Sequence, residues 1–158
     1  MSDGFRADLE PAIAAARCVC ALLEGVAQMD RWDFLDELEG ALITALYEVR
    51  RLPSVEPATE DLIPDLPQEV AQRYTGIGLS EWFPWWDSDP GPWNSDRHLV
   101  LVEDDLASVW NDLMEVLVAF DDPAVPVADV AWELRFGYDT HWGPHAVAAL
   151  PVIHRMCR

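Results

Sequence analysis

Apolar residues recur every three or four positions along most of the chain, the spacing of one buried face of an α-helix. The pattern is clearest over residues 31–51, where acidic residues cover much of the opposite face. Asp30 is a good N-cap for this segment, Arg50 suits the negative C-terminal end, and Pro53 follows the stop. We therefore predict a helix here, with a buried stripe of Trp32, Leu35, Leu38, Leu42, Leu46 and Val49.

The same spacing predicts four further helical segments. The first covers about 7–28, with Pro11 near its start, and the next begins at Pro67 and runs to about residue 83. Another covers about 104–120, and the last runs from about 127 to the C-terminal end. No alternating run is long enough for a sheet; "HLVLV" at 98–102 allows at most a short extended piece.

Proline and glycine divide this pattern. Pro144 would clash with the carbonyl of Thr140 in a continuous helix, so we expect the last segment to hinge at Gly143 and restart at Pro144. A second kink is expected at Pro151. The Pro-rich stretch 52–66 and the Trp/Pro-rich stretch 82–98 are predicted loops. Together these features predict one all-α domain over residues 1–158, a bundle of five or six helices.

Length and composition agree with a single cytoplasmic domain. The 158 residues suffice for one core, and 51% of them are hydrophobic. No apolar run reaches the ~18 residues of a membrane span. The N-terminal residues lack the features of a secretory signal, which favours the cytoplasm. Cys18 and Cys20 point apart on a helix, and three cysteines without a CxxC pair predict free thiols.

The net charge of the chain restricts the classes of partner that we expect. The chain has 29 acidic residues against 10 basic ones, all arginine, for a net charge of −19. This field repels nucleic acid and anionic membranes and favours basic proteins or metal cations. We expect a protein partner, possibly a basic one, and no nucleic acid or membrane partner.

His141 and His145 are the strongest candidates for a polar site. Their spacing of four would place two metal ligands on one helical face, with Asp139 and Glu133 close in sequence. Asp104 or Asp105 could supply a further carboxylate. The proline between the histidines weakens this geometry. The favoured interpretation is a structural corner whose imidazoles are held by hydrogen bonds, with no cofactor and no metal; a metal site is the alternative.

Two further polar features have structural explanations that we favour. The acids at 103–105 suit a helix N-terminus, although they could also bind a cation or serve acid–base chemistry. Arg135 could bind an anion, but stacking on Trp132 or Trp142, pairing with Asp139, or reaching Asp105 is the commoner outcome.

The Trp/Pro-rich stretch is the most distinctive local feature. It holds five aromatic residues in twelve positions, stiffened by proline. These rings could anchor a partner, or could fold back and close one end of the bundle. They are Trp82, Phe83, Trp85, Trp86 and Trp93.

A family resemblance rests on two segments, "DDLASVWNDL" and "VAWELRFGYDTHWGPHAVAAL". Together they resemble the bacterial family called domain of unknown function 5063, over about residues 65–158. The resemblance implies a small all-helical bacterial protein of the cytoplasm and supplies no activity or functional residues. From the acidic composition and the Trp/Pro-rich stretch we expect a non-enzymatic interaction protein that uses an acidic surface, the Trp-rich loop, or both. A metal-binding or metal-dependent enzyme site around His141 and His145 is the alternative.

Overall fold

The computed structural model of the chain describes residues 3–60, 63–74, 76 and 96–157. These residues form six α-helices, one 3-10 helix and no strand, which confirms the predicted all-α class. The helices are α1 (Asp3–Gly25), η1 (Val26–Gln28), α2 (Arg31–Arg50), α3 (Gln68–Ala71), α5 (Asp96–Asp121), α6 (Val127–Thr140) and α7 (Trp142–Met156). None of these helices is both long and apolar enough to span a membrane.

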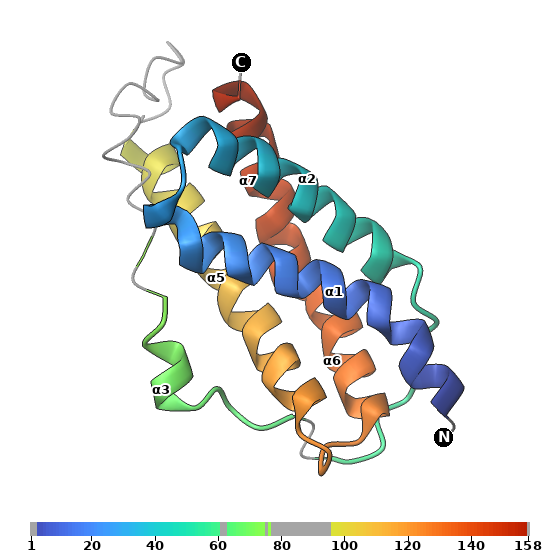
Figure 1. Cartoon of the computed structure of the whole chain (residues 1–158). Helices are drawn as coiled ribbons and strands as arrows, with labels where there is room; N and C mark the ends of the chain where they lie inside the picture. The colour runs from blue at the N-terminus through green and yellow to red at the C-terminus, as the bar shows by residue number, and fades with distance from the viewer. Residues whose placement is uncertain (1–2, 61–62, 75, 77–95, 158) are drawn as a thin grey trace.

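The long helices pack as a bundle of four rods (Figure 1). α1 packs against α2 and α5, and α2 in turn packs against α7. α6 and α7 follow one another along the length of α5, so the two together take the place of a fourth long helix (Figure 1). The junction between α6 and α7 is therefore set against the middle of the bundle.

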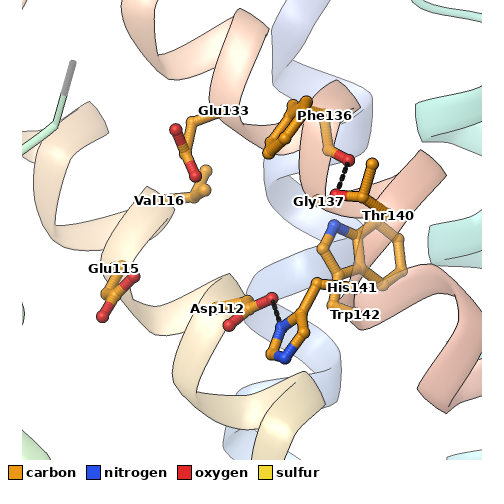
Figure 2. Close-up of a pocket in the computed structure, with 9 residues that line it drawn as sticks. All are labelled: Asp112, Glu115, Val116, Glu133, Phe136, Gly137, Thr140, His141 and Trp142. Carbon is orange, nitrogen blue, oxygen red and sulfur yellow. Dashed lines mark hydrogen bonds and ion pairs between the residues drawn. The ribbon is translucent and has the colours of Figure 1, made fainter.

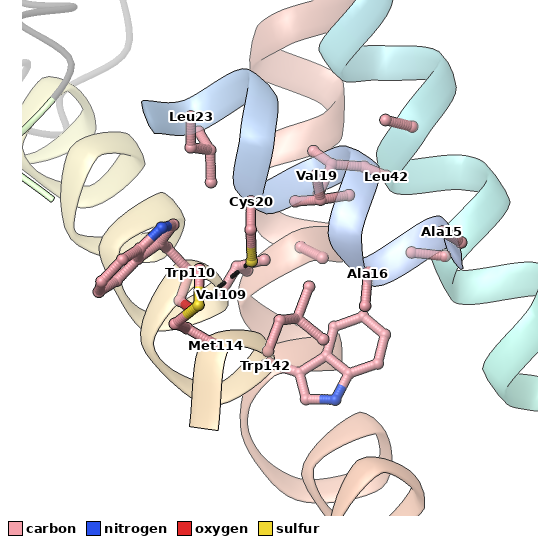
Figure 3. Close-up of a cluster of buried hydrophobic side chains, with 14 of the residues drawn as sticks. Ala15, Ala16, Val19, Cys20, Leu23, Leu42, Val109, Trp110, Met114 and Trp142 are labelled. Atoms are coloured by element: carbon pink, nitrogen blue, oxygen red, sulfur yellow. Dashed lines mark hydrogen bonds between the residues drawn. The ribbon is translucent and has the colours of Figure 1, made fainter. Parts of the chain in front are cut away.

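Two buried indoles fill the core, and each has a partner for its N–H group. Trp110 on α5 donates to Glu24 Oε1 at 3.1 Å, and Trp142 donates to the Leu134 carbonyl oxygen at 3.1 Å. Figure 3 shows the Trp142 ring beside Ala16 of α1. The Trp110 ring stacks on Tyr74, with 5.1 Å between centroids. The Cys20 thiol lies near the Trp110 carbonyl, and burial raises the pKa of this thiol well above its usual range. All three cysteines are free, as predicted.

α2 agrees closely with its prediction. The Asp30 side chain accepts a hydrogen bond from the Trp32 amide at 2.9 Å, which caps the helix. Leu35, Leu38 and Leu42 are fully buried. Trp32 was wrongly placed on this stripe: it is 48% exposed, and Arg31 stacks over its ring. The buried position in the first turn of α2 is Phe34, and Trp32 points to another side of the helix.

Two prolines lie in helix interiors. Pro11 was expected near the start of its helix, and Pro151 at a kink. α1 begins at Asp3, so Pro11 lies inside it, and Pro151 lies inside α7. Each proline removes one helical hydrogen bond. Both prolines are exposed, as are Ala7 and Val147, four residues before them. Water can therefore satisfy the freed carbonyl groups, and buried neighbours on the other face keep each helix intact.

α5 starts eight residues earlier than predicted. It begins at Asp96, so residues 98–102 are helical and not extended. Val102 and Leu106 are both buried and continue the helical stripe toward the N-terminal end. The acids at 103–105 therefore lie within the helix, and the expectation that they cap its N-terminus was wrong.

α3 is much shorter than the predicted helix. It covers only Gln68–Ala71, with Pro67 as its N-cap residue. Gly76 has a φ of +84°, a left-handed conformation that does not continue a helix. Only Val70 of α3 is buried. The rest of the predicted segment, residues 77–83, lies outside the residues that the structure describes.

A buried carboxylate ties the Pro-rich stretch 52–66 to α6. Asp129 is fully buried in the first turn of α6. Its Oδ1 accepts from the amides of Ala58 and Thr59, at 2.5 and 3.1 Å, and its Oδ2 accepts from the Thr59 hydroxyl at 2.7 Å. The carboxylate also suits the positive end of the helix dipole. This extended stretch is therefore fixed at one point by three hydrogen bonds.

The break between α6 and α7 falls at His141, two residues before the predicted hinge. His141 has φ −138° and ψ −83°, which turns the chain before Pro144 can meet the Thr140 carbonyl. Pro144 then sits in the first turn of α7, where its missing N–H is not needed. Gly143 is required for another reason: a Cβ there would overlap the Tyr138 carbonyl oxygen.

The Gly143→Ala variant should lose about 3 kcal/mol of unfolding free energy, because its new Cβ meets backbone that cannot move aside. Gly40→Ala is the matched control, since Gly40 is an exposed residue of α2 and nothing lies within 4 Å of the position of its added Cβ. That control should gain about 0.5–1 kcal/mol from helix propensity. Urea unfolding followed by circular dichroism measures both; equal effects would refute the packing argument for Gly143.

Asp129→Ala should cost about 3 kcal/mol, because it leaves two amides and a hydroxyl without their buried acceptor. Asp122→Ala is a matched control. Its exposed carboxylate accepts only the Ala124 amide, so the loss should be about 1 kcal/mol or less. Equal denaturation midpoints for the two variants would contradict the role given to Asp129.

Candidate functional site

A pocket opens where the α6–α7 corner faces α5 (Figure 2). Its volume is about 370 Å³, at the small end of the range of ligand sites. Acidic, aromatic and imidazole side chains from three helices meet around it. The lining residues are Asp112, Glu115, Val116, Glu133, Phe136, Gly137, Thr140, His141 and Trp142.

His141 stands at one side of the pocket in contact with Asp112. Its Nδ1 lies 2.5 Å from Asp112 Oδ2, and this pair joins the corner to α5 (Figure 2). The imidazole remains more than half exposed, whereas the carboxylate is mostly covered. Because Nδ1 is engaged by the carboxylate, the orientation of the ring is fixed by the fold.

His145 forms a second pair of the same kind, one turn along α7. Its Nδ1 lies 2.6 Å from Asp105 Oδ1, and its ring meets the His141 ring edge-on, with 4.9 Å between centroids. The two histidines are thus close, but each turns to its own aspartate. Within residues 3–60, 63–74, 76 and 96–157, no three His, Cys, Asp or Glu side chains are grouped as metal ligands.

Two glutamates in the pocket have raised pKa values. Burial is the main cause for both. The neighbouring carboxylates of Glu115 and Asp112 raise the pKa of Glu133 further. For Glu115, Asp112 and Asp65 also raise the pKa, whereas a hydrogen bond from Asn111 and the nearby His141 lower it. The pocket therefore concentrates negative charge that the fold only partly neutralises.

An aromatic wall closes the α6 side of the pocket. The Phe136 ring is 47% exposed, and Trp132 stacks on it with 4.7 Å between centroids and 9° between planes. Figure 2 shows the Phe136 ring beside the Glu133 carboxylate. A half-exposed ring next to a carboxylate offers both a flat apolar surface and a negative charge.

Arg135 and Asp139 lie beside the pocket and not in it. They form the expected i,i+4 ion pair at 3.1 Å. Arg135 also donates to the carbonyls of Arg50 and Leu52 at the end of α2. Of the alternatives given for Arg135, pairing with Asp139 is therefore the one observed, and its guanidinium lies 5.4 Å from the centroid of the Tyr138 ring.

The remaining sequence candidates separate into two groups. Asp104 is exposed, whereas Asp105 is buried against His145, since adjacent positions on a helix point in different directions. The aromatic cluster of the Trp/Pro-rich stretch lies outside the residues that the structure describes. It consists of Trp82, Phe83, Trp85, Trp86 and Trp93, and its role stays a prediction.

Asp112 and Glu115 were missed by the sequence reasoning. A signal did exist, because Asp105 and Asp112 are two turns apart on α5 and so share one face. Opposite them, His145 and His141 are one turn apart. Pairing acids with histidines in this order requires the register of α5 against α7, which the pattern of a single helix does not contain.

Comparisons with known proteins agree with this fold. Residues 93–157 match the model of a family described as a domain of unknown function, DUF5063, which confirms the expected resemblance over this segment. No curated protein matches the chain. The fold is similar to the crystal structure of protein BF1032 from Bacteroides fragilis, with a TM-score of 0.74 and 18% identity over 94% of this chain and 91% of that one. At this identity the likeness shows the fold alone.

Glu133→Gln should make the protein slightly more stable at neutral pH. A carboxyl whose folded pKa is raised binds its proton more tightly when folded, so stability falls as pH rises from the ordinary carboxyl range through the raised pKa. The amide removes this penalty. We expect the melting temperature to rise by about 1–2 °C at pH 7, with no gain below about pH 4.

Thermal unfolding at both pH values measures this difference, and Glu10→Gln on the exposed side of α1 controls for net charge. An equal gain in both variants would assign the effect to the overall field of the protein and not to the pocket.

Proposed function

We propose that this protein is a non-enzymatic interaction module that binds a basic protein partner through the pocket between α5, α6 and α7. The observation that carries the proposal is the gathering of Asp112, Glu115 and Glu133 around one small cavity, where burial and mutual repulsion raise the pKa of both glutamates. A positive group placed there would stabilise the ionised form of each carboxylate. The pocket is therefore expected to bind a cation in preference to a neutral or negative group.

Charge around the pocket supports the same partner. The net charge of −19 produces a long-range field that attracts basic proteins and accelerates their encounter. The nine lining residues include no arginine, and the chain contains no lysine. A partner would therefore supply the positive charge that the pocket lacks.

The paired histidines support a binding role over a reactive one. His141 and His145 each hold an aspartate through Nδ1, and these contacts join α7 to α5. Thr140, the hydroxyl residue of the lining, donates its hydroxyl proton to the Phe136 carbonyl within its own helix. These bonds stabilise the walls of the pocket and give the partner a fixed surface.

Replacing Glu115 and Glu133 together with glutamine should abolish capture of the partner and leave the fold intact. Tagged wild-type protein, this double variant and a Glu10→Gln/Glu37→Gln control are incubated with extract of the native cell at low salt. Bound proteins are then identified by mass spectrometry. The control carries the same change in net charge on exposed positions of α1 and α2.

We expect a basic protein to be enriched by the wild type and the control, and to be lost from the double variant. Circular dichroism checks that all three are folded. Loss of the partner from both double variants would mean that only overall charge matters, and equal capture by all three would exclude the pocket.

A further inference from the structure

We infer that the pocket receives one arginine side chain of the partner, with the guanidinium placed between the Glu133 carboxylate and the Phe136 ring. This inference rests on the proposed function and deepens it, because it names the group that is bound. Three properties of the pocket carry it: its size, its aromatic wall and its unpaired carboxylate.

The size of the pocket favours a side chain over a larger ligand. About 370 Å³ is near the lower limit for small-molecule sites and too small for a dinucleotide or a haem. The floor is closed by Gly137, where an added Cβ would lie 2.7 Å from the Trp142 ring. A slender group that enters end-on therefore fits this space better than a broad one.

The aromatic wall favours a planar cation. Trp132 covers one face of the Phe136 ring in a nearly parallel stack, while the Phe136 ring remains 47% exposed. A guanidinium is flat, weakly hydrated and stacks on aromatic rings, whereas an ammonium does so less well. The chain makes this contact elsewhere: Arg6 lies 4.0 Å from the centroid of the Phe120 ring.

The carboxylates supply acceptors that the fold leaves open. Among the described residues, the Glu133 carboxylate has no hydrogen-bond or ion-pair partner, and Glu115 accepts only from Asn111, at 3.1 Å. A guanidinium carries five N–H donors in a rigid fork that matches such oxygens. Binding would thus pair a charge that now stands alone.

The arginine nearest to the pocket in sequence does not fill it. Arg135, the only arginine of α6, is directed to carbonyls at the end of α2 and to Asp139. Since Arg135 is engaged by these groups and does not line the pocket, we assign the site to an arginine of another molecule.

Short peptides of defined sequence test the inference directly. The probe is acetyl-Gly-Gly-Arg-Gly-Gly-amide, with citrulline and lysine in place of arginine as comparison peptides. Binding to the full chain is measured by isothermal titration calorimetry and by changes in NMR amide shifts. Citrulline keeps the shape of arginine and removes its charge, and free agmatine reports whether a small guanidine suffices.

We expect the arginine peptide to bind at least tenfold more tightly than the citrulline peptide and several-fold more tightly than the lysine peptide. Glu133→Gln should weaken binding about tenfold, and Phe136→Leu should remove most of the preference for arginine over lysine. The Glu10→Gln control should bind like the wild type. If agmatine binds as tightly as the peptide, the natural ligand is a small guanidine compound and not an arginine of a protein.

Lower pH should weaken binding of the arginine peptide, because protons compete for Glu133 and Glu115, whose pKa values are raised chiefly by burial. The charged groups that act on these carboxyls are Asp112 on the same side of α5, Asp65 from the 52–66 stretch, and His141 from the corner. Calorimetry in buffers of different ionisation enthalpy should detect proton release on binding.

Two results would separate this inference from the proposed function. In the first, the arginine and citrulline peptides bind equally, and capture of the partner still depends on the two glutamates. This result would refute the arginine assignment and leave the proposed interaction module supported. Binding of the arginine peptide that is unchanged in Glu133→Gln would also refute the assignment, since the contact would then lie elsewhere.

Discussion

The buried indole of Trp142 is the contact on which the C-terminal half of the bundle depends. The residue is fully buried, its N–H is satisfied by the Leu134 carbonyl, and the Tyr138 ring meets it edge-on at 5.7 Å. Its ring leaves room only for glycine at 137. Because Trp142 is the first residue of α7, the same contact that fills the core also determines where α6 stops and α7 begins.

The position of the pocket follows from this corner. His141 is both the last cap of α6 and the residue before α7, and its dihedral angles direct its ring toward Asp112 on α5. One wall of the pocket is therefore held by the core, and another by the hydrogen bond between His141 and Asp112. A rigid wall of this kind lowers the conformational entropy that this protein loses when a partner binds.

Half-buried carboxylates that repel one another do not serve stability. A core made only for packing would place apolar side chains where Glu115 and Glu133 stand, since burial disfavours their charged forms. Proteins tend to break local rules at sites that are used for binding. The unfavourable electrostatics of this pocket are thus the best structural reason to connect it with a function.

Local pattern predicted the parts of the fold that depend on a single helix. The bounds of α2 followed from Asp30, the buried leucines and Pro53, all of which act within one turn of their own positions. Pro11 marked the start of α1 too late, and α7 continues past Pro151. The effect of an interior proline depends on whether water reaches the freed carbonyl, which is a property of the packed bundle. The histidine corner was predicted as a structural feature, but Asp112 and Glu115 could not be connected with it without the register between α5 and α7.

The three hydrogen bonds to Asp129 make the Pro-rich stretch more ordered than its composition suggests. By composition, residues 52–66 resemble a connection that tolerates insertion and variation. Yet the amides of Ala58 and Thr59 end on a carboxylate that no solvent reaches. Hydrogen exchange at these two positions then requires the start of α6 to open, so an irregular segment acquires the exchange protection of a helix. In a homologous chain, a change of length here would have to spare this anchor, whatever happens to the residues on either side.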